Sequence, residues 1–246
     1  MKILIFVDDS NFKANIKCIN EERKQDRVID YHKIHRFVLE YLLQNPQYNN
    51  EKLTHIRTYI YTGEYTDALF QRIKHTITNE TNPTKKSKFE YLLSETERFR
   101  EGQKKFLEKA ATFNFFEIRK KPLQFTQSKG VFQKGVDVQL AVDLVSNAYL
   151  NNYDIAALFS GDIDLLESLK LIKNLGKQII IFSHYRNVAK EMVRESDLLV
   201  DFQKLDNPIL DKFTHIFEKK ASSSHENTTT KKPLSQIIMP SKKNQS

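Results

Sequence analysis

The chain has 246 residues and a mass of 28.9 kDa, which is enough for one large domain or for one domain with a tail. Its formal net charge is +8, but residues 219–246 hold six lysines and one acid, so most of the excess belongs to that segment and says little about a nucleic-acid partner. One cysteine excludes a disulfide framework and a cysteine-built zinc site within one chain, and no apolar stretch approaches the roughly 20 residues that cross a bilayer. The start turns acidic too soon for a signal peptide, so we expect a soluble, cytoplasmic protein with no membrane partner.

Short apolar runs alternate with segments of helical periodicity over about residues 1–205. The runs that predict strands are, in chain order, 2–7, 55–61, 114–118, 153–159, 178–182 and 198–202. The segments that predict helices are 30–44, 136–149, 165–175 and 187–195. Continuous β-branched runs separated by amphipathic helices are typical of a parallel sheet covered on both faces. The sequence therefore predicts a three-layer α/β domain with a central, mostly parallel sheet.

Three regions depart from this alternation. Residues 85–109 favour a helix and hold eight basic and five acidic residues, which indicates either an amphipathic helix packed on the domain or a helical arm beside a substrate groove. This helix is the centre of an insertion expected over about 78–112. Residues 206–217 are expected to form a C-terminal helix. Residues 218–246, rich in Ser, Thr, Asn and Lys, are expected to be a disordered basic tail that binds an unidentified partner.

Acidic residues follow two of the predicted strands and begin one predicted helix. Asp8 ends the first strand, Asp162 and Asp164 follow the strand at 153–159, and Asp137 begins the helix at 136–149. Each has a simpler explanation as a turn residue or a helix cap. Ligands of open α/β sheets, however, bind outside the carboxyl ends of the strands. Carboxylates that converge there repel one another unless a cation neutralises them, and hard oxygen ligands select Mg²⁺ or Mn²⁺. Such ions hold phosphates and activate water, so the pattern indicates metal-assisted phosphodiester hydrolysis.

Other polar residues offer weaker signals. Asp143 lies six positions after Asp137, so on a regular helix it points about 240° away, which predicts a surface position. His32 and His35 share a helix face but have no third ligand nearby in sequence, so we expect them to flank the core. Cys18 is predicted in a polar loop without a neighbouring base, which argues against a thiol nucleophile.

Three segments resemble, in order, the signature blocks of the NYN domain, as found in the LabA-like members of the PIN-like ribonuclease superfamily. They are Phe-Val-Asp-Asp-Ser-Asn at 6–11, Lys-Gly-Val-Asp-Val-Gln-Leu-Ala-Val-Asp at 134–143 and Ser-Gly-Asp-Ile-Asp-Leu at 160–165. The resemblance covers about residues 1–202 and implies a PIN-like, Rossmannoid fold. Residues 17–30 and 78–109 look like insertions relative to the family.

The resemblance also implies roles for individual residues. The acidic residues that bind divalent metal for RNA cleavage would be Asp8, Asp137, Asp162 and Asp164. Asn11 and Asp143 would match accompanying polar positions, and Ser160 or Lys134 would contact phosphate. The departure is Asp9, because glycine is the family's usual residue there; its carboxylate would either point away from the site or alter it.

The leading hypothesis is therefore a ribonuclease that depends on Mg²⁺ or Mn²⁺, with RNA as its partner. Basic residues expected to hold the RNA backbone are Lys129, Lys134, Arg119, Lys120 and Lys121, although the last three also fit a solvated loop at a strand end. Phe125, Phe132 and Tyr65 are candidates to stack on bases, with core or rim packing as the simpler explanation.

Alternative functions are less well supported by the same residues. One is a non-catalytic RNA-binding or regulatory adaptor that retains the fold, which the extra carboxylate at Asp9 leaves open. A phosphatase with an aspartyl nucleophile is disfavoured, because Ser10 stands where its second aspartate would be. The sequence is compatible with a homo-oligomer.

Overall fold

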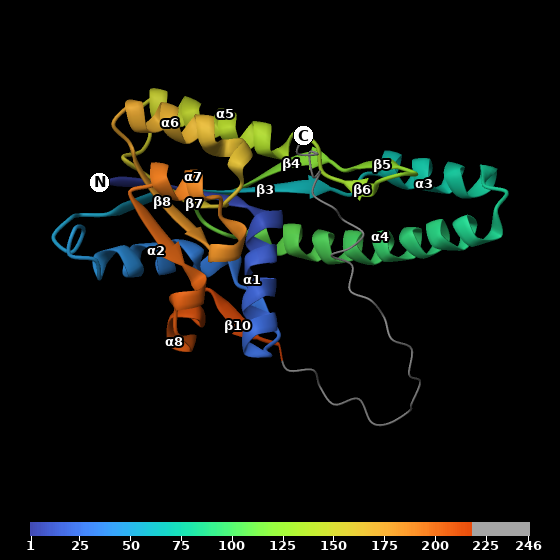
Figure 1. The fold of residues 1–246 in the computed structure, drawn as a ribbon, viewed down its shortest axis with the longest axis horizontal. Coiled ribbons are helices and arrows are strands. Elements are labelled where there is room, and N and C mark those ends of the chain that lie inside the picture. Colours follow the sequence, from blue (N-terminus) through green and yellow to red (C-terminus); the bar gives the residue numbers. More distant parts are fainter. Residues whose placement is uncertain (218–246) are drawn as a thin grey trace. The chain divides into compact units, whose positions relative to one another are not determined.

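The structure, a computed structural model, describes residues 1–217 (Figure 1). The expected disordered tail, 218–246, lies outside the described residues. The described chain divides into two compact units: residues 1–62, 113–119 and 137–217 form the first, and residues 63–112 and 120–136 form the second. Within residues 1–217, no helix combines the length and the apolar composition that a membrane span requires.

A six-stranded sheet forms the centre of the fold and confirms the predicted three-layer α/β architecture. Its order is β4-β3-β1-β7-β8-β9, and the pairs from β3 to β9 are all parallel. The strands are β1 (Lys2–Asp8), β3 (Thr54–Glu64), β4 (Phe116–Pro122), β7 (Ile155–Phe159), β8 (Gln178–Ser183) and β9 (Leu198–Asp201). Along the chain, β3 and β4 each pass from one unit into the other.

Helices cover both faces of this sheet, as Figure 1 shows. They are α1 (Asp9–Arg23), α2 (Ile34–Leu43), α5 (Val136–Tyr149), α6 (Leu166–Asn174) and α7 (Lys190–Glu195). The alternation along β1 explains the layers, because side chains of successive residues point to opposite faces of a strand. Ile3, Ile5 and Val7 are buried in one core with the apolar residues of α1 and α2. On the other face, Phe6 packs edge-on against Tyr153, with ring centroids 5.7 Å apart.

Helix α1 corrects one expectation. It extends to Arg23, so Cys18 lies within this helix rather than in a polar loop. The helix is mostly polar, which hides its period in the sequence. Its buried face is nevertheless regular, since Phe12, Ile16 and Ile19 recur at helical spacing in the core.

The C-terminal segment is also different from the expected helix over 206–217. Helix α8 covers only Asn207–Leu210, and β10 (Thr214–Ile216) pairs antiparallel with β2 (Arg27–Ile29). The hydrogen bonds to β2 favour an extended backbone over a longer helix. Phe213, between the two elements, is fully buried in the main core.

A buried arginine fixes this segment to the first unit. Arg27 is 3% exposed, and its guanidinium donates to Thr214 Oγ1 and to Asn207 Oδ1, each at 3.1 Å, and to the carboxylate of Asp211. A buried charge is stable only when it is paired and hydrogen-bonded. The fourth acceptor is Gln25 Oε1, at 2.9 Å from Arg27 Nε, and the other three come from the last eleven described residues.

The second unit has its own small core. It contains α3 (Asp67–Asn79), α4 (Pro83–Ala110) and the antiparallel hairpin of β5 (Gln124–Thr126) and β6 (Gly130–Phe132). The charged helix expected over 85–109 is α4. Its buried residues pack with those of α3 and the hairpin, and this cluster comprises Leu69, Ile73, Phe89, Leu92, Leu123, Phe125 and Val131.

Candidate functional site

The register between β1 and β7 brings two strand ends together. Val7 pairs with Phe159, so Asp8 and Ser160 are neighbours at the carboxyl edge of the sheet. Ser160 Oγ donates to Asp8 Oδ2 at 3.3 Å and accepts from the backbone N–H of Asp162 at 3.3 Å. Because Ser160 is fully buried, it links two acidic segments and presents no surface to a phosphate.

Asp8 ends β1 and also caps α1. Its Oδ1 accepts hydrogen bonds from the backbone N–H groups of Ser10 and Asn11, both at 3.1 Å, and from Ser10 Oγ at 2.9 Å. Its side chain is almost entirely buried. Burial raises the pKa of Asp8 to about 6, against the lowering effect of these hydrogen bonds, and the negative charges of Asp137 and Asp9 raise it further.

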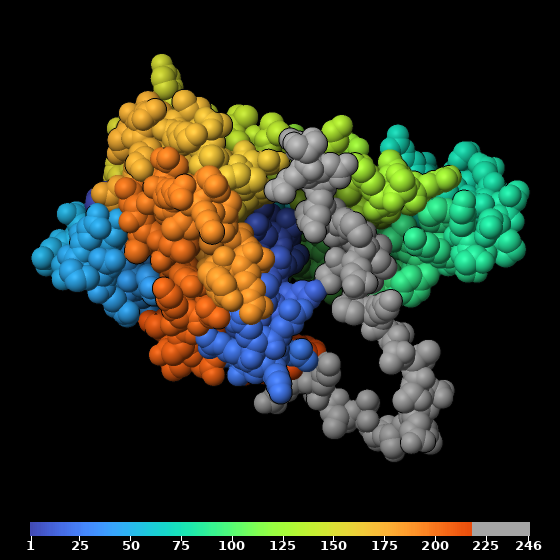
Figure 2. All heavy atoms as spheres, viewed as in Figure 1, coloured from blue at the N-terminus to red at the C-terminus, as the bar shows by residue number. Residues whose placement is uncertain are grey.

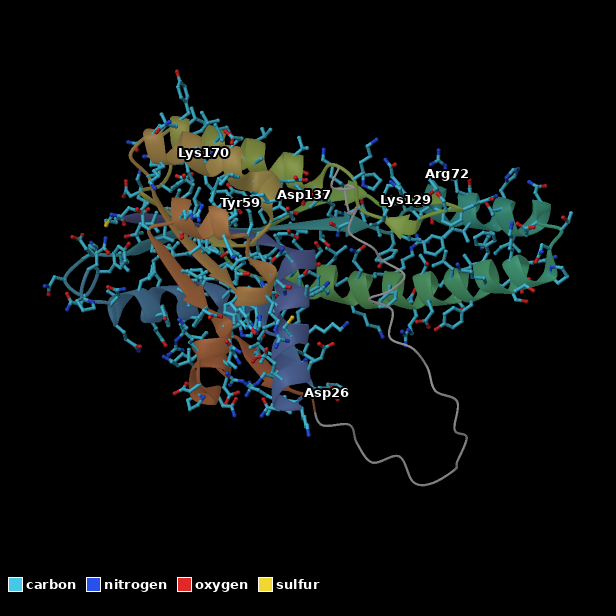
Figure 3. The ribbon with its side chains drawn as sticks, viewed as in Figure 1. Asp26, Tyr59, Arg72, Lys129, Asp137 and Lys170 are labelled. Carbon is cyan, nitrogen blue, oxygen red and sulfur yellow. The ribbon has the colours of Figure 1, made fainter. Side chains whose placement is uncertain are left out.

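Asp137 lies in the first turn of α5 (Figure 3). Its carboxyl is half-buried, and burial raises its pKa; the charges of Asp162 and Asp164 add to the increase. These effects require the groups to be close, so the start of α5 and the segment after β7 meet at one place. Asp137 is therefore near Asp8 and near Asp162 and Asp164, whereas the charges of Asp162 and Asp164 are not among those that raise the pKa of Asp8; these four acids are called the carboxylate cluster below.

Two of these acids, Asp8 and Asp162, each cap a helix. Asp162 caps the short helix Ile163–Leu165 by accepting from the backbone N–H of Asp164 at 3.0 Å. Asp8 caps α1 in the same way. The cap explains why each carboxylate has a fixed orientation, and the sheet topology explains why the caps share an edge.

No cationic side chain among the described residues pairs with the acids of this carboxylate cluster. None of the ion pairs within residues 1–217 involves Asp8, Asp137, Asp162 or Asp164. In the same residues, no three His, Cys, Asp or Glu side chains are arranged so that they could hold a metal ion by themselves. The cluster thus offers hard oxygen donors without a complete protein cage.

Asp9, at the position where the family resemblance expects glycine, is held by donors from three elements. It is 5% exposed and accepts from Thr62 Oγ1 at 2.9 Å, from Lys13 Nζ at 2.7 Å and from the hydroxyl of Tyr31. The ion pair with Lys13 distinguishes it from the four unpaired carboxylates. The extra acid is therefore accommodated beside the cluster, and its charge still acts on Asp8.

Two asparagines of α1 organise the loops around the cluster. Asn11 Oδ1 accepts from the backbone N–H of Gly161 at 3.3 Å. Asn15, fully buried, accepts from Asn187 Nδ2 at 2.9 Å and from Ser183 Oγ at 3.3 Å. Sequence reasoning missed Asn15; the signal was a polar residue beside Ile16, within the apolar stripe of α1.

The expected surface position of Asp143 is wrong. Its side chain is 21% exposed and accepts from the hydroxyl of Tyr61 at 2.9 Å, with Arg119 Nε at 3.6 Å. This face of α5 meets β3 and β4 rather than solvent. Burial and the charge of Asp143 raise the pKa of Tyr61. Asp143 is not among the groups that shift the pKa of Asp8 or Asp137, so it is not part of the carboxylate cluster.

The basic residues expected to hold RNA are divided between the units. Arg119, Lys120 and Lys121 lie within β4, so the loop interpretation of this run is wrong. Arg119 belongs to the first unit and pairs with Glu117 at 3.1 Å, and the other four belong to the second unit. In the second unit, Lys120 pairs with Glu64, whereas Lys129 and Lys134 are exposed.

The aromatic candidates pack against protein groups of the second unit. Phe125 is buried, with its ring edge-on to Phe89 at a centroid distance of 6.0 Å. Tyr65 stacks on Phe99, with centroids 6.5 Å apart. Phe132 lies under the ammonium of Lys129, 5.6 Å from the ring centroid.

Comparison with known proteins bears on the family and the fold. A family described as the NYN domain matches residues 2–206. The crystal structure of a protein of unknown function from Vibrio parahaemolyticus RIMD 2210633 is similar, with a TM-score of 0.50 and 17% sequence identity over 87% of this chain and 96% of that chain. At this identity the similarity shows the fold alone. No curated protein was found to match the chain.

Proposed function

Because this chain belongs to the NYN domain family, whose fold is that of PIN-like nucleases, we propose that it is a ribonuclease that depends on Mg²⁺ or Mn²⁺. The observation that carries the proposal is the carboxylate cluster, four acids from two strand ends and a helix start without a cationic partner within residues 1–217. Asp8 is buried, Asp137 and Asp162 are half-buried, and Asp164 is exposed. Such a concentration of negative charge destabilises the protein at neutral pH unless a cation binds. Its presence at the ligand-binding edge of the sheet favours a functional role.

The donor set fits a magnesium-type ion even though it forms no complete cage. Mg²⁺ keeps several waters and is commonly bound by one or two carboxylates together with substrate phosphates. Asp8 and Asp162 would hold the ion, and Asp137 and Asp164 would complete its ligand shell or orient the water. When bound, the ion would polarise a phosphate oxygen and lower the pKa of an attacking water.

The remaining residues of the site orient these acids. Ser160 and the N-terminus of α1 fix the two oxygens of Asp8, and Asn11 holds the backbone at Gly161, next to Asp162. Positions fixed before the substrate arrives reduce the reorganisation that the reaction requires. In this proposal the basic side chains that contact the RNA backbone are Arg119, Lys120, Lys121, Lys129 and Lys134.

The direct test is cleavage of a labelled single-stranded RNA by the full chain in Mn²⁺. We expect cleavage that EDTA abolishes, and a loss of about 100-fold or more in the Asp162→Asn variant, since one charged ligand is removed. Asp154→Asn is the matched control, because Asp154 precedes the same strand at the opposite edge of the sheet and binds the backbone N–H of Lys2. It should retain activity within a few-fold. RNA binding without cleavage by the unaltered chain would instead support the adaptor alternative.

The reaction should slow as the pH falls through about 6. Asp8 must be ionised to act, and its pKa is raised to about 6, so a proton neutralises it two units above the range of an ordinary aspartate. At subsaturating Mn²⁺ the dependence of kcat/KM on pH reports this group in the free protein. Asp9→Asn should move the acidic limb to lower pH, because one negative charge beside Asp8 disappears. A limb centred near pH 4 in the unaltered chain would contradict the assignment.

A further inference from the structure

The two units differ in the sign of their charge. The second unit, residues 63–112 and 120–136, contains 14 Lys and Arg residues against 8 Asp and Glu. The described part of the first unit contains 19 against 21. The positive excess of the described chain therefore belongs to the unit that does not hold the carboxylate cluster.

Most of this positive charge is available to a partner. Three ion pairs occur among the described residues of the second unit, and they join Arg98 to Glu95, Arg100 to Asp67 and Lys120 to Glu64. The other eleven cations of this unit have no carboxylate partner within residues 1–217. Because surface ion pairs screen charge locally, unpaired cations give the stronger long-range attraction for a polyanion.

The basic residues are distributed along the unit rather than gathered at one point. Lys85, Lys86 and Lys88 lie near the start of α4, and Lys104, Lys105 and Lys109 lie near its end. The helix has 28 residues, which corresponds to about 40 Å. Much of the surface of α3, α4 and the hairpin is visible in Figure 2. Charge spread over this length suits an extended polyanion better than a small phosphorylated ligand.

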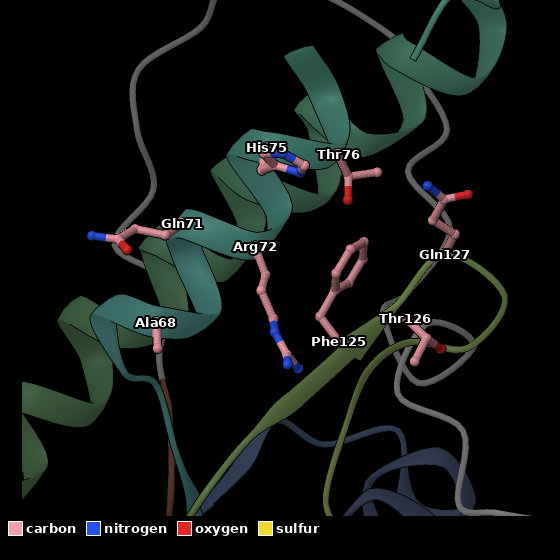
Figure 4. A pocket seen from close by; sticks show the side chains of 8 residues that line it. All are labelled: Ala68, Gln71, Arg72, His75, Thr76, Phe125, Thr126 and Gln127. Carbon is pink, nitrogen blue, oxygen red and sulfur yellow. The ribbon is translucent and has the colours of Figure 1, made fainter. Parts of the chain in front are cut away.

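A shallow groove of about 560 Å³ lies between α3 and the hairpin (Figure 4). Its volume is within the range of about 300–1,000 Å³ that is usual for ligand sites. Arg72 on α3 and Phe125 on β5 extend into it, and no carboxylate lines it. Arg72 is exposed, has no ion pair in the described part of the chain, and offers the planar fork that binds phosphate with two hydrogen bonds.

The other polar groups of the groove suit nucleobases. Gln71 and Gln127 carry side-chain amides, and Thr126 carries a hydroxyl; each group both donates and accepts hydrogen bonds. The carboxylates of an acidic peptide need donors only, whereas base edges and the 2′-hydroxyl need both kinds of partner. Phe125 is 6% exposed, so it forms the apolar floor and is not a free stacking platform.

We propose that the second unit is a binding site for single-stranded RNA, in which the groove between α3 and the β5–β6 hairpin takes a short stretch of nucleotides and unpaired lysines of the same unit bind the backbone. The choice of RNA among polyanions rests on the proposed function. The site itself rests on Arg72, the amide groups and the unpaired cations of this unit. It is distinct in sequence and in structure from the carboxylate cluster of the first unit.

The test is RNA binding by the full chain in EDTA, which prevents cleavage. The probe is a fluorescent oligouridine of about 12 nucleotides, within the usual site sizes of single-strand binders. Arg72→Gln should weaken binding about 3- to 10-fold and reduce the slope of log K against log salt by about 0.7, which corresponds to one phosphate contact. Gln127→Ala should weaken binding with an unchanged slope.

Lys52→Gln is the matched control. It also removes one exposed positive charge, but Lys52 precedes β3 at the amino edge of the sheet in the first unit, and it should bind RNA like the unaltered chain. The proposal is overturned if Arg72→Gln and Lys52→Gln have the same affinity and slope, or if polyglutamate competes as well as unlabelled RNA. Binding in EDTA is independent of cleavage: an inactive chain whose binding depends on Arg72 would refute the ribonuclease but retain the groove.

Discussion

The Asp8→Asn variant should lose RNA cleavage and become more stable at the same time. Asparagine caps a helix as well as aspartate does, and its oxygen can still accept from Ser10 and Asn11. The substitution removes a charge whose burial raises the pKa of Asp8 from 3.8 to about 6. We therefore expect a gain of about 1–3 kcal/mol in the free energy of unfolding at pH 7, and a loss of about 100-fold or more in cleavage.

The gain should depend on pH in a defined direction. The folded-state pKa of Asp8 lies above its unfolded value, so the proton favours the folded state, and stability decreases as the pH rises from about 4 to about 6. The difference between the variant and the unaltered chain should be largest above pH 6 and vanish near pH 4. Urea unfolding at several pH values measures it.

Asp201→Asn is the control for this substitution. Asp201 ends β9 at the same edge, is also buried, and caps the short helix Phe202–Lys204 by accepting from the backbone N–H of Gln203 at 3.1 Å. It lies outside the carboxylate cluster, so the variant should cleave RNA within a few-fold of normal. An Asp8→Asn variant that is less stable at pH 7, or fully active, would show that Asp8 is a structural cap only.

The Gly161→Ala substitution should reduce both stability and cleavage. A Cβ atom at this position would lie 2.2 Å from the backbone oxygen of Asn187 and 2.5 Å from Cα of Val188. Backbone atoms cannot rotate away as a side chain can, so the segment between Ser160 and Asp162 must shift. We expect a loss of about 2–3 kcal/mol in stability and at least about tenfold in cleavage, because both neighbours of Gly161 contribute to the acidic edge.

Gly102→Ala is the matched comparison. Gly102 lies within α4, and a Cβ there would meet no atom within 4 Å. Alanine is the better helix former by about 0.5–1 kcal/mol, so this variant should unfold at higher urea concentration and cleave RNA normally. Equal effects of the two substitutions on unfolding and on cleavage would show that the close approach at Gly161 is not needed.

Strongly patterned elements could be predicted from the sequence, and elements with mixed patterns could not. Strands β7 and β8 are continuous apolar runs, and α5 has the bounds that its apolar stripe predicts, Val136–Tyr149. The body of α1 was missed because its solvent side is rich in charged and amide residues. Helix α3 and the β5–β6 hairpin were missed because each buries only a few side chains, in a separate small core.

The candidate site likewise contains residues that the sequence could predict and residues that it could not. Asp8 and Asp162 could be chosen because parallel strands end at one edge of a sheet, a rule that needs no coordinates. The environments of Asp9, Asn15 and Asp143 could not be predicted, because their hydrogen-bond partners are distant in sequence. Asp9, for example, accepts from Thr62 only because β3 lies beside β1. The spacing along the helix predicts that Asp143 faces solvent, but its hydrogen bond with Tyr61 on β3 shows that it faces the sheet.

The buried arginine of β2 bears on how this protein should be shortened for experiments. The family match ends at residue 206, which suggests a natural place to truncate. A fragment that ends there would lack the acceptors Asn207 and Thr214, to which Arg27 donates. It would also lack Phe213, whose ring stacks on that of Phe12 with centroids 6.1 Å apart. A fragment that keeps these contacts must therefore extend at least to Thr214, beyond the end of the family match.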